Sequence, residues 1–245
     1  MCDAVAIELP FDEFIDTVKA GRAELAPLFE CKNSATTPEI FAVGNSHLDL
    51  EWLWTTEETR RKTARTLGNQ MQILEEYSDY KYIQSQPWIL ETVKNEYPDL
   101  YEEVKQAVKD GKIIVEGAAW VQPDTNIVSG ESMVRQFMVG KQFIEKEFGT
   151  DSKIFWLPDS FGISGALPQI MKGCGVDYFM NAKITWLYNG GDEFPQSVFM
   201  WKGIDGTEVM STIIQEYATM ITPSAIFEKW RQNREKEDVP VRLVP

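Results

Sequence analysis

The stretch SGESMVRQFMVGKQFIEKEFGTDSKIFWLPDSFG, residues 129–162, decides the fold class. Its first part carries apolar residues at helical spacing: Met133, Phe137, Ile144 and Phe148. Ser129 is a residue type that favours the N-cap of a helix, and Gly149 one that favours its end. The apolar run that follows, IFWL (154–157), is short enough to predict a strand buried on both faces. A helix followed at once by a buried strand is typical of an α/β protein.

The same alternation runs along most of the chain. We expect strands at residues 40–44, 80–84, 113–117, 154–157, 177–181 and 208–214, and helices at 57–77, 98–109, 129–148 and 166–172. A charged helix is also expected at 227–238. Such alternation predicts a parallel sheet with helices outside, either doubly wound or closed into a barrel. The chain has no glycine-rich phosphate loop, so nucleotide binding has no support.

The composition of the chain limits the kinds of binding partner and the cellular compartment that we expect for the protein. The 245 residues carry a net charge of −14, which disfavours nucleic acid and anionic membranes as partners. No apolar run approaches the length needed to span a bilayer. The three cysteines form no CxxC pair, and the N-terminus does not resemble a signal peptide. We therefore expect a cytoplasmic protein without disulfides.

The first residues differ from the rest. Residues 1–34 hold one amphipathic segment, and a polar stretch ending near Pro38 reads as a linker. We expect residues 1–34 to form a helical extension and residues 35–245 to form the α/β domain.

In both α/β architectures, active sites lie at the carboxyl ends of the strands. The run at 40–44 is followed by His47, which is the only histidine, and by Asp49. In an extended segment these two side chains point to the same side, so both can reach one metal ion. A buried imidazole hydrogen-bonded to an aspartate explains the pair equally well.

Two further strand ends carry acids. Asp159 follows the run at 154–157, where it is either a functional carboxylate or a turn cap. Glu116 and Asp124 follow the run at 113–115. His47, Asp49 and Asp159 together offer one nitrogen and two carboxylates, a set that suits zinc and also manganese or cobalt.

Tryptophan is abundant, with eight residues in the chain. Flat aromatic rings bind the apolar faces of sugar rings, although most tryptophans are expected in the core. Trp52 and Trp120 are the best candidates for a sugar site because they stand beside the acids.

Three motifs resemble glycoside hydrolase family 38 α-mannosidases, most closely the cytoplasmic and bacterial branch. They are GNSHLDLEWLW (44–54), EGAAWVQPDTNIVSGESMVRQ (116–136) and WLPDSFGISGALPQIMKGCGVDYF (156–179). Their order and spacing are those of the family, and the likeness runs from about Ile40 to Val209.

The resemblance implies a seven-stranded α/β barrel, a (β/α)7 barrel, that binds one zinc ion. It implies that His47 and Asp49 are zinc ligands, and that Asp159 is both a ligand and the catalytic nucleophile. It also implies that Trp52, Trp120, Asp124 and Lys183 contact the substrate. The activity implied is hydrolysis of terminal α-D-mannosides in mannose-containing oligosaccharides, with retention through a covalent mannosyl-enzyme.

Members of the family are several times longer than this chain, and we expect the full-length protein to be able to form oligomers. From the resemblance we expect the general-acid aspartate and a second histidine ligand to lie beyond Pro245, so that the barrel is incomplete and the chain weakly active or inactive. Two other functions stay open: a metal-dependent carbohydrate deacetylase or amidohydrolase on a related barrel, and a non-catalytic mannose- or metal-binding remnant.

Overall fold

The computed structural model describes residues 8–32, 37–186, 194–233, 235–236 and 238–245. The chain divides into two compact units, Met1–Thr37 and Pro38–Pro245. The described residues of the first unit form helix α1 (Phe11–Phe29). All other described helices and strands belong to the second unit.

The second unit alternates strands and helices. Its strands are β1 (Glu39–Ala42), β2 (Gly44–Asn45), β3 (Tyr82–Gln84), β4 (Ile113–Val115), β5 (Ile154–Trp156), β6 (Tyr178–Asn181), β7 (Val198–Lys202), β8 (Glu208–Ile213) and β9 (Val241–Val244). Its helices are α2 (Thr56–Glu76), α3 (Pro87–Glu96), α4 (Pro98–Lys109), α5 (Gly130–Phe148), α6 (Leu167–Gly173), the short 3-10 helix η2 (Lys183–Thr185) and α7 (Pro223–Arg231).

The strands form three short sheets, β1-β9, β2-β3-β4 and β5-β6-β8-β7. Every described pairing is parallel except that of β7 with β8. The α/β class with parallel strands is therefore confirmed. The antiparallel edge strand β7 was not predicted. A tight turn at Gly206, with φ +91°, connects it to its partner β8.

Several predicted elements match closely. Helix α4 occupies the predicted residues 98–109. Ser129 accepts a hydrogen bond from Ser132 N at 3.2 Å and caps α5, and Gly149 ends that helix with φ +69°. A left-handed φ of this kind costs glycine little, which explains the residue type there.

Other predictions were wrong in detail. The charged helix expected at 227–238 ends at Arg231. The single strand expected at 40–44 is divided into β1 and β2, which pair with different strands. Helix α3 was not predicted at all; it begins at Pro87 and is separated from α4 only by Tyr97.

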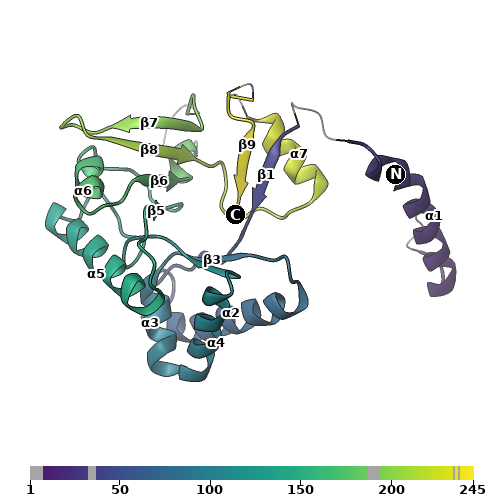
Figure 1. Ribbon diagram of the computed structural model, residues 1–245, viewed down its shortest axis with the longest axis horizontal. Coiled ribbons are helices and arrows are strands. Elements are labelled where there is room, and N and C mark those ends of the chain that lie inside the picture. The colour runs from purple at the N-terminus through teal and green to yellow at the C-terminus, as the bar shows by residue number, and fades with distance from the viewer. Residues whose placement is uncertain (1–7, 33–36, 187–193, 234, 237) are drawn as a thin grey trace. The chain divides into compact units, whose positions relative to one another are not determined.

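The buried side chains form three clusters. One lies among α2, α3, α4, β3 and β4, which gather on one side of the second unit, and includes Leu67, Leu90 and Val104 (Figure 1). A second joins α5 and α6 to β5 and β6. The third contains Ile83, Trp156, Met180, Ala182 and Ile214, which come from β3, β5, β6 and the residues just after β6 and β8. This third cluster packs together strands from two of the sheets, close to where several strands end.

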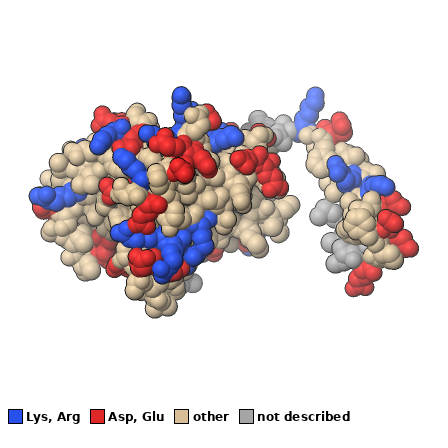
Figure 2. All heavy atoms as spheres, turned by 90° about the horizontal axis from the view of Figure 1, so that it is seen from below, with Lys and Arg blue, Asp and Glu red and all other residues tan. Residues whose placement is uncertain are grey.

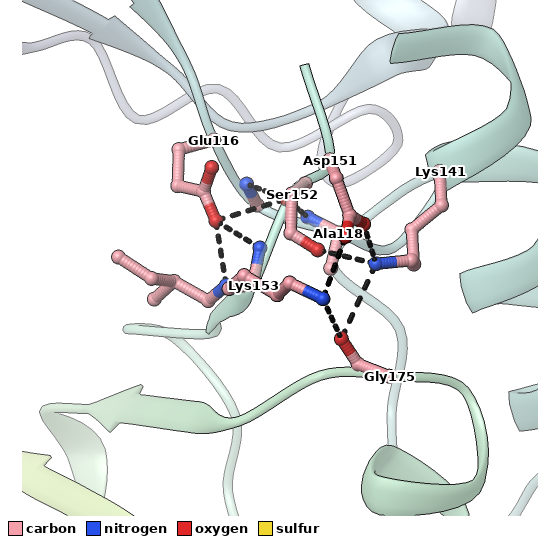
Figure 3. A network of polar contacts seen from close by, with 9 residues as sticks. Glu116, Ala118, Lys141, Asp151, Ser152, Lys153 and Gly175 are labelled. Carbon is pink, nitrogen blue, oxygen red and sulfur yellow. Dashed lines mark hydrogen bonds and ion pairs between the residues drawn. The ribbon is translucent and has the colours of Figure 1, made fainter. Parts of the chain in front are cut away.

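A polar network joins the end of β4 to the start of β5 (Figure 3). Glu116 Oε1 accepts hydrogen bonds from Ser152 Oγ at 3.0 Å and from the backbone N–H groups of Lys153 and Ile154, each at 2.6 Å. Ser152 Oγ in turn accepts from Ala118 N at 2.9 Å. One carboxylate thus ties the two sheets together where no backbone pairing between β4 and β5 is described.

The surface carries charges of both signs. On the face that Figure 2 shows, lysine and arginine side chains gather among acidic ones, so this face has no uniform acidic field despite the net charge of −14. None of the described helices combines the length and the apolar character that crossing a membrane requires.

Candidate metal centre

His47, Asp49 and Asp159 converge although they are far apart in the sequence. His47 and Asp49 lie in the loop after β2, and Asp159 lies just beyond β5. His47 Nε2 is 2.9 Å from Asp49 Oδ1 and 3.2 Å from Asp159 Oδ2. One potential ligand atom from each of the three residues lies within 4.8 Å of the others. The strand-end rule therefore placed these acids at a common site.

The imidazole of His47 sits between the two carboxylates. Its Nε2 faces both, while its Nδ1 is buried and has no hydrogen-bond partner. The ring also packs against Tyr217, with centroids 4.8 Å apart. An orphaned buried nitrogen is unusual in a purely structural histidine, because burying a polar atom without a partner is costly.

Lys183 completes the cluster from the opposite side of Asp159. Its Nζ lies 3.1 Å from Asp159 Oδ1, and its side chain is only 8% exposed. Burial lowers the pKa of Lys183, but hydrogen bonds to Asp159 and Tyr217 outweigh it and raise the pKa above its ordinary value. The ammonium group therefore remains charged at neutral pH.

Three of the described aromatic rings lie around the same ammonium group. Lys183 Nζ lies 3.6 Å from the ring centroid of Trp186, 5.1 Å from that of Phe161 and 5.4 Å from that of Tyr217. Cations are attracted to aromatic faces at such distances. The rings both hold the lysine in place and line the cluster with flat apolar surface.

This arrangement suits a divalent cation. Among the described residues of the cluster, the two carboxylates of Asp49 and Asp159 stand beside the one ammonium group of Lys183, so a bound cation would balance the charge. A set of one imidazole and two carboxylates matches the residue types that bind catalytic zinc. The residues present therefore fit the zinc ion that the family resemblance implies.

The other candidate residues lie in different settings. Trp52 is 66% exposed and packs edge-on against Trp54, with ring centroids 5.3 Å apart. The ring of Trp120 packs against Phe143 of α5 at 5.6 Å. Asp124 accepts hydrogen bonds from the backbone N–H groups of Asn126 and Ile127, at 2.7 and 2.8 Å. These contacts give Trp120 and Asp124 clear structural roles, and their contact with substrate stays a prediction.

Three aromatic residues of the cluster were missed in the sequence. Phe161 lies two residues after Asp159, in a segment that was singled out only for its acid. Trp186 follows η2, and Tyr217 follows β8, at the same kind of strand end that pointed to the acids. Applying the strand-end rule to β8 would have found Tyr217. Trp186 carried no such signal, because its position depends on the turn after Lys183.

Comparison with known proteins identifies the family of this chain. The model of the glycosyl hydrolases family 38 N-terminal domain matches residues 37–245. Alpha-mannosidase G of Dictyostelium discoideum is 42% identical over 75% of this chain and 17% of its own length. An alpha-mannosidase of Saccharomyces cerevisiae is 36% identical over 82% of this chain and 18% of its own length.

The solved structures give the same fold. An alpha-mannosidase from Enterococcus faecalis V583 superposes with a TM-score of 0.68 at 22% identity, over 85% of this chain and 24% of that one. The chain thus spans less than a fifth of the length of the two curated relatives named above. Because the family model covers residues 37–245, this chain belongs to glycosyl hydrolase family 38, within the N-terminal domain of that family.

Proposed function

We propose that this chain carries the metal-binding and nucleophilic part of a zinc-dependent α-mannosidase that acts on terminal α-D-mannosides with retention of configuration. The observation that carries the proposal is the convergence of His47, Asp49 and Asp159 within 4.8 Å at the ends of strands. The curated relatives described above are named alpha-mannosidases, which supports mannose-containing oligosaccharides as the substrate class.

In this proposal Asp159 is the nucleophile. One of its carboxylate oxygens forms a bond to the anomeric carbon while the bond from that carbon to the leaving-group oxygen breaks. The leaving oxygen takes a proton from a general acid, and water then releases the sugar from Asp159. His47, Asp49 and Asp159 would hold a zinc ion, which would supply a Lewis acid for the hydroxyls of the mannose ring.

Lys183 and the aromatic side chains hold the nucleophile and the sugar. Lys183 contacts Asp159 Oδ1 at 3.1 Å and so restricts the rotation of the carboxylate. The exposed face of Trp52 offers a platform for an apolar sugar face. Trp120 and Asp124 are assigned to the periphery of the substrate site.

The proposal also covers the domain organisation and the cellular location of the enzyme. Residues 35–245 are assigned to a seven-stranded barrel domain and residues 1–34 to a helical extension. The described cysteines Cys31 and Cys174 are free, which supports a cytoplasmic location because reducing compartments keep thiols unpaired. The isolated chain is expected to be a weak catalyst.

Covalent trapping tests the proposal. A mannosyl fluoride that carries a second fluorine on the sugar ring is a suitable reagent. The fluoride on its anomeric carbon leaves readily, so the reaction needs little help from a general acid. Mass spectrometry should find one mannosyl adduct on the peptide that contains Asp159, in the presence of zinc. The adduct should be absent from Asp159→Asn and unchanged in Asp177→Asn, which removes only a surface partner of Lys172.

Two outcomes would count against the proposal. Labelling of Asp159→Asn to the same extent as the parent chain would show that another residue is the nucleophile. Binding of mannose without any adduct would instead favour a non-catalytic sugar-binding role.

A further inference from the structure

The loop that carries His47 and Asp49 has no backbone ladder to hold it. Among the described residues, no backbone group of residues 46–51 pairs with another backbone group. Yet three consecutive carbonyls of this loop, those of Leu48, Asp49 and Leu50, each accept a hydrogen bond from a side chain. The three donors come from three different places in the chain.

Gln86 holds the carbonyl between the two ligands. Its Nε2 donates to Leu48 O at 2.9 Å, and its Oε1 accepts from Gln122 N at 3.1 Å. The backbone N–H of Gln86 donates to Gln84 Oε1 at 3.1 Å, and the residue is only 4% exposed. A buried amide with both ends occupied has one orientation, so it fixes the position of Leu48.

Trp54 and Thr59 hold the next two carbonyls together. Trp54 Nε1 lies 3.2 Å from Asp49 O and 3.1 Å from Thr59 Oγ1, and the hydroxyl of Thr59 donates to Leu50 O. Thr59 lies on α2 and is fully buried. The ring of Trp54 is held in turn by Lys62, whose Nζ lies 4.4 Å from the ring centroid.

We propose that Gln86, Trp54 and Thr59 are positioning residues that preorganise the loop for metal binding. The peptide planes on either side of Asp49 set the direction of its side chain, and holding Leu48 restrains the backbone directly after His47. Fixing the carbonyls of these planes keeps both side chains aimed at Asp159 before a metal arrives. Residues that orient metal ligands commonly change metal affinity by about 10–100-fold when mutated. The affinity part of the inference rests on the metal site of the proposed function.

The chain offers a matched pair of variants. Thr59→Val removes the hydroxyl that links Trp54 to Leu50. Thr63→Val makes the same change one turn later on α2, at a residue that is equally buried and whose Oγ1 has no hydrogen-bond partner. Both variants test the cost of valine in the helix, and only the first touches the loop. Gln86→Leu is a second test variant that acts from α3 rather than α2.

His47 is the only histidine, so its ring is a single NMR probe of the loop. In the metal-free chain labelled with 13C-histidine, we expect one sharp ring signal, shifted by Tyr217, in the parent and in Thr63→Val. In Thr59→Val and Gln86→Leu the signal should broaden, split or move toward the position of an unstructured histidine. Titration with zinc chloride should then give a dissociation constant about 10-fold weaker in these two variants and within about twofold of the parent in Thr63→Val.

The metal-free NMR spectrum tests the positioning role, and the zinc titration tests the proposed metal site. Identical metal-free spectra for Thr59→Val, Gln86→Leu and Thr63→Val would overturn the positioning role. A parent chain whose His47 signal does not respond to zinc would overturn the proposed metal site, while the metal-free comparison would still decide whether these residues order the loop.

Discussion

Replacing Glu116 should weaken the whole second unit, because this residue joins β4 to β5. Its Oε1 accepts from Ser152 Oγ and from two backbone N–H groups, the latter at 2.6 Å. Hydrogen bonds to a charged group contribute about 1.5–3 kcal/mol each, and a buried donor left unpaired costs about 1–3 kcal/mol. The three bonds share one oxygen and are not additive, so Glu116→Leu should cost about 3–5 kcal/mol.

Glu116→Gln should cost less, about 1–3 kcal/mol, because the amide oxygen still accepts hydrogen bonds without the charge. Urea unfolding followed by tryptophan fluorescence measures both variants. With a slope of about 2–3 kcal/mol per molar, Glu116→Leu should lower the midpoint by about 1–2.5 M.

Glu131→Leu is the control. It removes an exposed ion pair with Arg135, which contributes little, so its midpoint should stay near that of the parent. Equal midpoints for Glu116→Leu and Glu131→Leu would refute the view that the Glu116 carboxylate holds the two sheets together.

Two further predictions concern stability. Hydrogen bonds from Lys141 and Lys153 lower the pKa of Asp151 to about 2, so its ion pairs stabilise the folded chain above pH about 4 and stop doing so as the pH falls to about 2. The stability difference between the parent and Asp151→Asn should shrink across that window in thermal melts, and a difference that stays constant would contradict the assignment. At Gly140, an added Cβ would lie 2.3 Å from Ala118 O, so Gly140→Ala should force α5 away from the chain after β4 and destabilise by about 2 kcal/mol or more. Gly173→Ala, where a Cβ meets nothing, is its control, and equal melting temperatures would argue against close packing at Gly140.

The parts of the fold that could be predicted are those with local signals. Helix α5 has a capping serine, a regular apolar face and a terminal glycine, and its bounds follow from these residues. Strand β9 is only four residues long, and its partner β1 lies about 200 residues earlier in the chain. No local sequence pattern therefore predicts this pairing. Helix α3 is only ten residues long and lies between Pro87 and Pro98. Proline marks turns as well as helix starts, so this segment gave no clear helix signal.

Some residues of the candidate site could be identified from local sequence signals, and others could not. His47, Asp49 and Asp159 follow strands whose apolar runs are visible in the sequence, so a general rule about strand ends located them. Lys183 was identified from the family resemblance alone, since a lysine after a strand has no specific meaning. The support of the loop by Gln86, Trp54 and Thr59 depends on side-chain contacts between distant segments, which no spacing pattern encodes.

Zinc content measured on the chain and on His47→Ala tests the central claim most directly. After exposure to zinc and dialysis, elemental analysis should find about one zinc ion per chain in the parent and close to none in His47→Ala, because the variant loses the only imidazole of the set. Equal zinc in both proteins would contradict the assignment of His47, Asp49 and Asp159 as the metal centre.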